Sequence, residues 1–323
     1  ARGEAPAGVS TDTPPNPTES AARAAADAYR ESGADGIIAF GGGSSMDLAK
    51  AMGLMVTHEG PFERLGGSKR GMKFITKIPP LVAVPTTAGT GSEVSPGAVV
   101  ILDNGMKETF VSAHLVPVVA VCDPELTLGL PASLTAATGM DAMTHCIEAV
   151  LTPVVHPPAE AIGVDGAERI GKWLEVAVKD GANRDARWHM MMGSFEGALA
   201  FAKGLGAVHG LSHALGRIHE LKLHHGTLNA VILPHSLAMI GNSAEEKFAR
   251  LRRALGLAPN ADLPQYIADL NARIGLPSGL GAMGVKAEHG EGAIDYAVAD
   301  LATLSNAVPF DGDKYRELFK RAL

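Results

Sequence analysis

The sequence predicts a two-domain protein of the α/β class, with a parallel sheet in residues 1–130 and an all-helical domain in residues 131–323. In the first part, short and fully apolar runs alternate with helical patterns, which is typical of parallel strands covered by helices. After Asp123 the strand signals stop, and alanine, leucine and methionine recur at helical spacing. This change of pattern places the domain boundary at about residue 130.

The elements of the first domain follow from local signals. Residues 1–15 are rich in Pro, Gly, Ser and Thr and predict a loop. Asn16 and Pro17 predict the N-cap and the first position of a helix, which ends at Gly33. A glycine turn at 41–43 leads directly into a second helix. Apolar runs predict strands buried on both faces, all in one parallel sheet, over residues 36–40, 81–84, 98–102 and 116–122.

Composition and charge narrow the class of protein. The chain has 323 residues, 46% of them hydrophobic, and a mean hydropathy of +0.12, which indicates a globular protein. The net charge of −7 and the lack of a long basic run argue against a nucleic-acid partner and against charge-driven attachment to membranes. No apolar run reaches the length of a membrane span. Cys122 and Cys146 lie in apolar segments as reduced thiols would, so we expect a cytoplasmic protein.

The glycine turn Gly41-Gly42-Gly43-Ser44 lies between an expected strand and an expected helix. Glycines let a phosphate approach the backbone, and the helix N-terminus supplies free N–H groups and a positive dipole end. The turn does not match the dinucleotide pattern G-x-G-x-x-G, because position 46 is methionine. The sequence therefore favours phosphate binding here, with a structural strand-to-helix turn as the alternative.

A second loop rich in small and hydroxyl residues, 84–93, follows the strand predicted at 81–84. The carboxyl ends of parallel strands form ligand crevices in α/β sheets. Alone, this loop is equally well interpreted as a turn rich in serine and threonine. Two such loops after neighbouring strands favour a nucleotide site.

Six of the 12 histidines lie within residues 204–235. His209 and His213 are four residues apart, so a helix would present both from one face, and Asp141 and His145 have the same spacing upstream. Imidazole and carboxylate ligands from two helices suit one divalent cation. An ionised aspartate in apolar surroundings also needs a partner. A structural role is the alternative for any single histidine, and we favour it for His219, His224 and His235.

Five segments, taken in order along the chain, resemble the iron-containing (group III) alcohol dehydrogenase family. The resemblance runs from about Asn16 to the C-terminus, and it implies a Rossmann-like nucleotide-binding domain followed by a helical, metal-binding catalytic domain. The segments are Gly41-Gly42-Gly43-Ser44-Ser45-Met46-Asp47, Pro85-Thr86-Thr87-Ala88-Gly89-Thr90-Gly91-Ser92-Glu93, Asp123-Pro124-Glu125-Leu126, Gly139-Met140-Asp141-Ala142, and His209-Gly210-Leu211-Ser212-His213 with His225-Gly226.

The resemblance implies a role for each matching residue. His213 is implied to lie near the nicotinamide and the alcohol, outside the metal ligands. The substrate is implied to be an alcohol or its aldehyde, and the assembly a homodimer. The implied ligands of Fe²⁺, with Zn²⁺ as the alternative, are Asp141, His145, His209 and His225. The implied contacts of NAD, with NADP as the alternative, are Asn16, Gly42, Gly43, Ser44, Asp47, Thr86, Thr87, Ser92 and Lys107.

Two departures from the family pattern bear on these roles. The segment between His209 and His225 is slightly longer than usual, so His224 is an alternative ligand; we favour His225 because Gly226 follows it. The family's chains also begin several tens of residues earlier. The resemblance implies that this upstream part carries the first strands of the sheet and the acidic residue that contacts the adenosine ribose. The completeness of the cofactor site and the preference between NAD and NADP therefore stay open.

The resemblance implies reversible hydride transfer between an alcohol and NAD, with the metal as a Lewis acid on the substrate oxygen. His213 or a chain of waters would carry the proton. Three alternatives remain: a metal-free reductase of the maleylacetate type in the same superfamily, a metal-dependent hydrolase that uses the same ligands, and a folded but inactive protein.

Overall fold

The computed structural model describes residues 5–323, with Asn242 described by its backbone alone. Contacts divide the chain into two compact units. Unit 1 is the chain up to Thr86 together with Ser92–Asp123, and unit 2 is Thr87–Gly91 together with Pro124–Leu323. The short loop Thr87–Gly91 therefore packs with the C-terminal part of the chain. Among the described residues, no helix is both long and apolar enough to cross a membrane.

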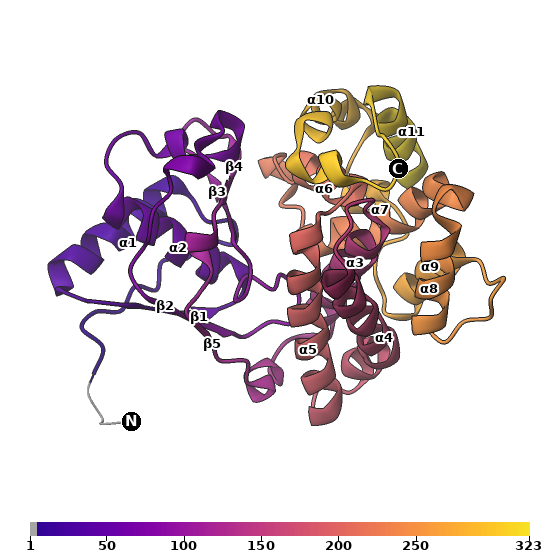
Figure 1. Cartoon of the computed structure of the whole chain (residues 1–323), viewed down its shortest axis with the longest axis horizontal. Coiled ribbons are helices and arrows are strands. Elements are labelled where there is room, and N and C mark those ends of the chain that lie inside the picture. The colour runs from indigo at the N-terminus through magenta and orange to yellow at the C-terminus, as the bar shows by residue number, and fades with distance from the viewer. Residues whose placement is uncertain (1–4) are drawn as a thin grey trace. The chain divides into compact units, whose positions relative to one another are not determined.

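Unit 1 contains the parallel sheet (Figure 1). Strands β1 (Ile37–Gly41), β2 (Leu81–Pro85) and β5 (Val119–Ala120) pair in parallel in the order β1-β2-β5. Helices α1 (Glu19–Ser32) and α2 (Gly43–Thr57) flank β1 in the sequence. Because β1 and β2 run in the same direction, the turn after β1 and the loop after β2 lie at the same edge of the sheet.

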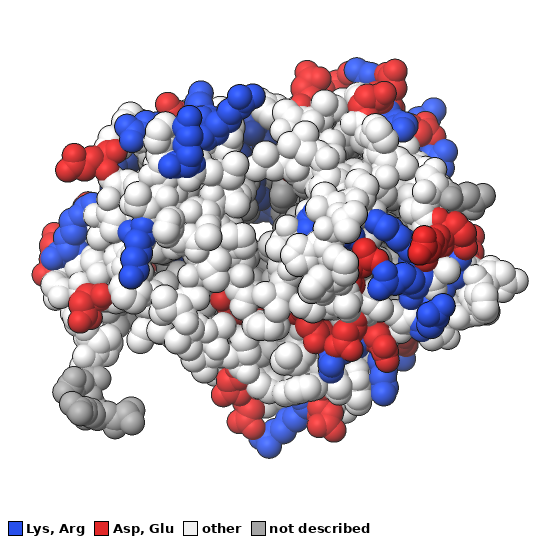
Figure 2. Space-filling view, viewed as in Figure 1, with Lys and Arg blue, Asp and Glu red and all other residues white. Residues whose placement is uncertain are grey.

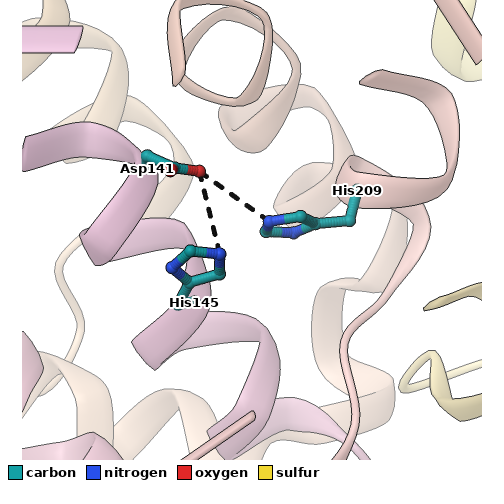
Figure 3. A group of neighbouring side chains, drawn as sticks. All are labelled: Asp141, His145 and His209. Carbon is teal, nitrogen blue, oxygen red and sulfur yellow. Dashed lines mark ion pairs between the residues drawn. The ribbon is translucent and has the colours of Figure 1, made fainter. Parts of the chain in front are cut away.

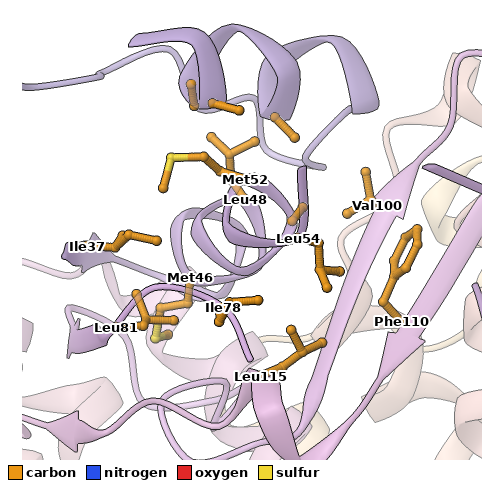
Figure 4. Packing of buried hydrophobic residues seen from close by; sticks show 14 of the residues in the cluster. Ile37, Met46, Leu48, Met52, Leu54, Ile78, Leu81, Val100, Phe110 and Leu115 are labelled. Atoms are coloured by element: carbon orange, nitrogen blue, oxygen red, sulfur yellow. The ribbon is translucent and has the colours of Figure 1, made fainter. Parts of the chain in front are cut away.

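The core of unit 1 forms where α2 packs on the sheet and α1 packs on α2. Ala22 and Ala26 of α1 are fully buried, and their small side chains let α1 pack closely on α2. Met46 and Leu54 of α2 are also fully buried, and Figure 4 shows them among side chains from the strands and from segments next to the strands, such as Ile78 and Leu115. Burying each such side chain contributes roughly 1.5–3 kcal/mol, so this cluster fixes α2 on the sheet.

Helix α1 begins later than the sequence predicts. The predicted N-cap Asn16 is wrong, because Thr18 caps the helix by accepting a hydrogen bond from the Ala21 amide at 3.2 Å. The chain is still extended at Thr18, and the carbonyl of Pro17 before it accepts the Ile101 amide at 2.8 Å. The predicted end at Gly33 is confirmed, and this glycine adopts the left-handed conformation that commonly ends helices.

The expectation that the parallel strands are buried on both faces is wrong for β1. Ile37 and Ala39 are buried, but the side chains between and after them, Ile38 and Phe40, are 71% and 61% exposed. In the described part of unit 1, α2 packs on one face of the sheet and α1 packs on α2. The other face therefore stays open, and successive side chains of β1 alternate between the core and solvent.

The strand predicted over residues 98–102 exists, but not in the parallel sheet. β3 (Gly97–Ile101) pairs antiparallel with β4 (Lys107–Val111), which the sequence analysis missed. A tight turn at Asp103-Asn104-Gly105 joins the two strands, and Gly105 has a φ of +80°. The strand predicted over 116–122 is reduced to Val119–Ala120, because Pro117 cannot donate a hydrogen bond to a neighbouring strand.

Unit 2 is helical, as predicted, and the described residues of this unit contain no strand. The central helix α3 (Ala132–Leu151) is buried from Thr135 to Leu151 and packs against α4, α5 and α7. An α/β part followed by a helical part confirms the predicted fold class. The other helices of unit 2 are α4 (Pro157–Lys179), α5 (Arg184–Ala200), α6 (Ala207–Leu215), α7 (His225–Ile240), α8 (Glu245–Ala254), α9 (Leu263–Arg273), α10 (Ala287–Ala299) and α11 (Gly312–Ala322).

The surface carries both signs of charge (Figure 2). Several of these charges form short-range ion pairs within one helix, such as Arg30 with Asp27 at 2.9 Å and Arg321 with Glu317 at 2.7 Å. Exposed pairs of this kind contribute little to stability, so the fold depends mainly on its buried side chains.

Candidate metal centre

The candidate metal ligands come from three helices of unit 2. Helix α3 carries Asp141 and His145 one turn apart, so both side chains project from the same face. Figure 3 shows these two side chains facing His209 of α6. The fourth candidate, His225, is the first residue of α7. Asp141, His145 and His209 are at most 5% exposed, so a charge at this place must be compensated by a neighbouring group.

The donor atoms converge on the Asp141 carboxylate. Its Oδ1 lies 3.8 Å from His145 Nε2, 3.8 Å from His209 Nε2 and 3.5 Å from His225 Nε2. Donors of Asp141, His145 and His209 all lie within 4.8 Å of one another. Four ligands at about 2.1 Å from one tetrahedral ion lie roughly 3.4 Å apart. The mutual spacing of Asp141, His145 and His209 therefore fits ligands of a single divalent cation, and His225 Nε2 is a further imidazole nitrogen beside the same carboxylate.

The protonation of His145 suits a ligand. Burial lowers the pKa of this imidazole to about 4, although the nearby Asp141 opposes the shift. His145 is therefore neutral at pH 7 and keeps a nitrogen lone pair for a cation.

The carboxylate of Glu148 lies behind His209. Glu148 Oε2 is 2.6 Å from His209 Nδ1, the ring nitrogen that faces away from Asp141. Burial lowers the pKa of His209, but the hydrogen bond with Glu148 and its negative charge more than offset this, so the pKa is raised.

Asn229 of α7 lies beside the same donors. Its Nδ2 donates to Asp141 Oδ1 at 2.7 Å and lies 3.2 Å from Nε2 of both His209 and His225. This amide is fully buried and holds the Asp141 carboxylate in place. It follows His225 by four residues, so both side chains project from one face of α7.

His213, predicted to be catalytic, lies next to the cluster of ligands. Its ring stacks on His225 at 5.2 Å between ring centroids and meets His209 edge-on at 5.7 Å. Its Nδ1 lies 3.0 Å from Oδ2 of Asp300, which directly follows α10. This pairing leaves Nε2 as the ring nitrogen with which His213 can exchange a proton.

The structure favours His225 over its neighbour His224 as a candidate ligand. His224 is exposed, and its Nδ1 lies 3.4 Å from Thr227 Oγ1, whereas His225 Nε2 is the atom beside Asp141. His219 is exposed in the short 3₁₀ helix His219–Leu221. His235 is half-buried on α7, nine residues beyond Gly226.

The glycine after His225 is required by close packing of α7 on α3. A methyl group at Gly226 would lie 2.2 Å from the Ala137 carbonyl oxygen and 3.2 Å from Asp141 Cβ. No larger residue fits unless α7 moves away from α3. Such a movement would carry His225 away from Asp141.

We therefore expect Gly226→Ala to weaken metal binding by about 10-fold or more and to lower the free energy of unfolding by about 1–3 kcal/mol, as overpacking does. Gly292→Ala is the matched control, because a methyl group at this helical position of α10 meets no atom within 4 Å. Metal titration and chemical denaturation of both variants check the expectation. Equal metal affinity in the two variants would contradict it.

Spacing along the sequence could have indicated two of the residues that the sequence analysis missed. Glu148 follows Asp141 by seven residues on the same face of α3, and Asn229 follows His225 by four. Asp300 is 87 residues from His213, and no local pattern connects the two.

The glycine turn of unit 1 forms the start of α2. Gly42 is its N-cap residue, and Gly41 has a φ of +148°, which favours glycine. The Thr86 amide donates to the Gly41 carbonyl at 2.9 Å, so the loop after β2 lies against this turn. Ser44 Oγ donates to the carbonyl of Pro15. Among the predicted nucleotide contacts, Gly42, Gly43, Ser44, Thr86 and the chain near Asn16 are thus close together.

Asp47, Ser92 and Lys50 form a buried group behind this turn. Asp47 Oδ1 accepts the Ser92 hydroxyl at 2.7 Å, and Asp47 Oδ2 accepts the Val99 amide at 3.0 Å. The ammonium group of Lys50 donates to the Ser92 carbonyl at 2.7 Å and to Ser92 Oγ at 2.9 Å. These contacts fix the start of the segment after Gly91 against α2.

Lys107 lies near enough to this group for its positive charge to oppose the rise in the pKa of Asp47 that burial causes. Lys107 begins β4 and pairs with Ile101 of β3, whose amide is bound by Pro17, the neighbour of Asn16. Thr87 belongs to the loop Thr87–Gly91, which packs within unit 2.

Comparison with known proteins gives a consistent result over the whole chain. A family model described as iron-containing alcohol dehydrogenase matches residues 2–124, and a model of the C-terminal part of the Fe-containing alcohol dehydrogenase family matches residues 135–323. A 4-hydroxybutyrate dehydrogenase of Cupriavidus necator is 49% identical over 98% of this chain and 85% of its own length. An NAD-dependent methanol dehydrogenase of Bacillus methanolicus is 35% identical over 96% of this chain and 82% of its own length.

Solved structures agree with the sequence comparisons. The crystal structure of a 1,3-propanediol oxidoreductase matches with a TM-score of 0.93 and 33% identity, over 98% of this chain and 84% of that one. A maleylacetate reductase of Rhizobium sp. strain MTP-10005 matches with a TM-score of 0.81 and 29% identity, over 98% of this chain and 82% of that one.

Proposed function

We propose, from the premise that this chain belongs to the iron-containing alcohol dehydrogenase family, that Asp141, His145, His209 and His225 hold its catalytic metal. The chain is a metal-dependent alcohol dehydrogenase, which transfers a hydride between an alcohol, or its aldehyde or ketone, and a nicotinamide cofactor. The observation that carries the proposed ligand set is the convergence of three imidazole Nε2 atoms on Asp141 Oδ1 within 3.5–3.8 Å.

In unit 2, the proposed metal ligands and His213 have different roles in the reaction. When bound, the metal supplies Lewis acidity toward the substrate oxygen, and NAD supplies the hydride acceptor. Asp141 would contribute negative charge and the imidazoles would contribute lone pairs; Asp141, His145 and His209 are buried, and His225 is 31% exposed. We infer that His213 takes the proton from the alcohol at Nε2 and passes it toward solvent, while Asp300 holds its Nδ1 at 3.0 Å.

We propose that the cofactor is held mainly by unit 1. The free amides at the start of α2 suit a pyrophosphate, and the contact of Thr86 with Gly41 supports one continuous site. Asp47 and Ser92 support this site from behind, through their hydrogen bond to each other. The proposed cofactor contacts are Asn16, Gly42, Gly43, Ser44, Asp47, Thr86, Thr87, Ser92 and Lys107.

The proposal also covers the identity of the cofactor and the metal, the oligomeric state and the location in the cell. NAD is the proposed cofactor, with NADP as the alternative, and Fe²⁺ is the proposed metal, with Zn²⁺ as the alternative, because three imidazoles and a carboxylate suit both ions. We propose a homodimer in the cytoplasm, from the family resemblance and from the two free cysteines, Cys122 and Cys146.

Metal removal tests the proposal. After treatment with a chelator, we expect alcohol-dependent reduction of NAD to fall by at least about 100-fold, because the Lewis acid is lost. Activity should return with Fe²⁺ or Zn²⁺, while NAD binding persists throughout. The assay should offer 4-hydroxybutyrate, methanol and 1,3-propanediol, the compounds named in the similar enzymes. The control is the same chelator already saturated with metal.

The same experiment separates the alternatives. Full turnover of the chelated protein would favour a metal-free reductase of the maleylacetate type, which the similarity to such an enzyme keeps under consideration. The four converging donors favour the metal-dependent reaction instead. A hydrolase would need no NAD, and an inactive protein would show no turnover in any combination of cofactor and alcohol.

A further inference from the structure

Glu148 makes two hydrogen bonds that meet at the start of α6. Its Oε1 accepts the Val208 amide at 2.8 Å, and its Oε2 accepts the N–H of His209 Nδ1 at 2.6 Å. The side chain is 5% exposed and extends from α3, the helix that carries Asp141 and His145. Gly206 makes room for it, because a methyl group there would lie 2.7 Å from Glu148 Oε1.

Capping of α6 does not by itself explain the hydrogen bond between Glu148 and His209. The N-terminus of α6 has a second side-chain cap, since Asn306 Oδ1 accepts the Ala207 amide at 2.9 Å. Glu148 adds a bond to the imidazole ring itself. A carboxylate on Nδ1 fixes the tautomer that carries its lone pair on Nε2, the atom that faces Asp141.

The negative charge of Glu148 also suits a site for a divalent cation. Asp141, a candidate ligand, and Glu148, which contacts the candidate ligand His209, are both carboxylates that are at least 95% buried. Three neutral imidazoles leave a divalent cation with two positive charges. Two buried carboxylates neutralise that charge where water cannot.

We propose that Glu148 is a positioning residue of the metal centre: it holds His209 with Nε2 toward Asp141 and supplies the second negative charge that balances a divalent cation. This inference rests on the proposed metal site and adds to it a residue outside the ligand set. Glu148 acts through His209 and need not touch the substrate.

The test compares Glu148→Gln with Asn306→Ala. The first variant keeps the shape of the side chain but removes its charge, and the second removes one amide hydrogen bond of α6 without touching a ligand. The dissociation constant for Zn²⁺ is measured by competition with a chelator, and the visible spectrum is recorded with Co²⁺ in place of the native metal. We expect Glu148→Gln to weaken Zn²⁺ binding by about 10–100-fold and to change the Co²⁺ bands. Asn306→Ala should lower thermal stability but keep the affinity within about 3-fold of the unsubstituted chain.

Equal Zn²⁺ affinity and identical Co²⁺ bands in Glu148→Gln and the unsubstituted chain would overturn the inference. Should the Gln variant not fold, Glu148→Asp replaces it: the charge is kept, but the shorter side chain lengthens the contact with His209. That variant must also bind Zn²⁺ more weakly than Asn306→Ala, and equal binding would overturn the inference. If the unsubstituted chain binds no Zn²⁺, or if Asp141→Ala binds it equally well, the proposed metal site itself is wrong, and the inference is overturned with it.

Discussion

Asp141→Ala is expected to lower kcat/KM for alcohol-dependent reduction of NAD by about 10³-fold or more. Asp141 supplies the atom that all three histidine Nε2 atoms face, so its loss removes both a ligand and a negative charge. Lewis-acid stabilisation contributes several kcal/mol in metal-dependent enzymes, and each 1.36 kcal/mol is a factor of about ten in rate. Steady-state kinetics, with the metal content measured on the same sample, check the result.

Two adjacent histidines provide a matched pair of variants for this prediction. His225→Ala removes a candidate ligand and should reproduce most of the loss. His224→Ala changes the preceding residue, which is exposed and faces Thr227, and should keep nearly full activity. Full turnover in Asp141→Ala would end the proposed ligand set. Loss of activity in His224→Ala, together with full activity in His225→Ala, would identify His224 as the fourth ligand in place of His225.

Lys50→Met is expected to lower the free energy of unfolding by about 3–5 kcal/mol, the effect of removing one partner from a buried charged group. The ammonium group is fully buried, and its three N–H donors are shared among four acceptors at 2.7–2.9 Å: the carbonyls of Ser92, Ser95 and Gly97, and Ser92 Oγ. Methionine fills a similar volume but leaves these acceptors without a donor. It also leaves Asp47 without the positive charge that offsets its burial.

Chemical denaturation followed by circular dichroism measures this effect. Lys179→Met is the control, because Lys179 is 68% exposed and forms an ion pair with Glu175 on its own helix at 2.7 Å. We expect a change within about 0.5 kcal/mol for the control. A loss below about 1 kcal/mol in Lys50→Met would show that the buried lysine is replaceable. Weaker NAD binding in a folded Lys50→Met variant would connect this group to the cofactor side of the enzyme.

The elements that depend on local chemistry were predictable from the sequence. The end of α1 at Gly33 and the glycine turn into α2 follow from backbone preferences of single residues. The paired spacing of Asp141 with His145 on a helix likewise needed no knowledge of the tertiary structure. Each of these signals lies within a few residues of the feature that it predicts.

The features that depend on distant segments were not predictable in this way. An apolar run such as Ile37–Phe40 does not show whether one face of its strand or both will be covered, because the covering helices lie elsewhere in the chain. The contact of Glu148 with His209 spans 61 residues, and local spacing carries no information about it. The antiparallel pairing of β3 with β4 is intermediate, because the turn Asp103-Asn104-Gly105 signals a hairpin once it is recognised.

The placement of the proposed metal ligands on three separate helices would make the cation a cross-link of unit 2. Only the folded chain brings Asp141, His209 and His225 together, so bound metal favours the native state by mass action. At a free metal concentration 100 times the dissociation constant, this linkage contributes about 2.7 kcal/mol. A cell that runs short of iron would then hold less of this enzyme as well as a less active one, because the unloaded chain unfolds more often and is degraded sooner.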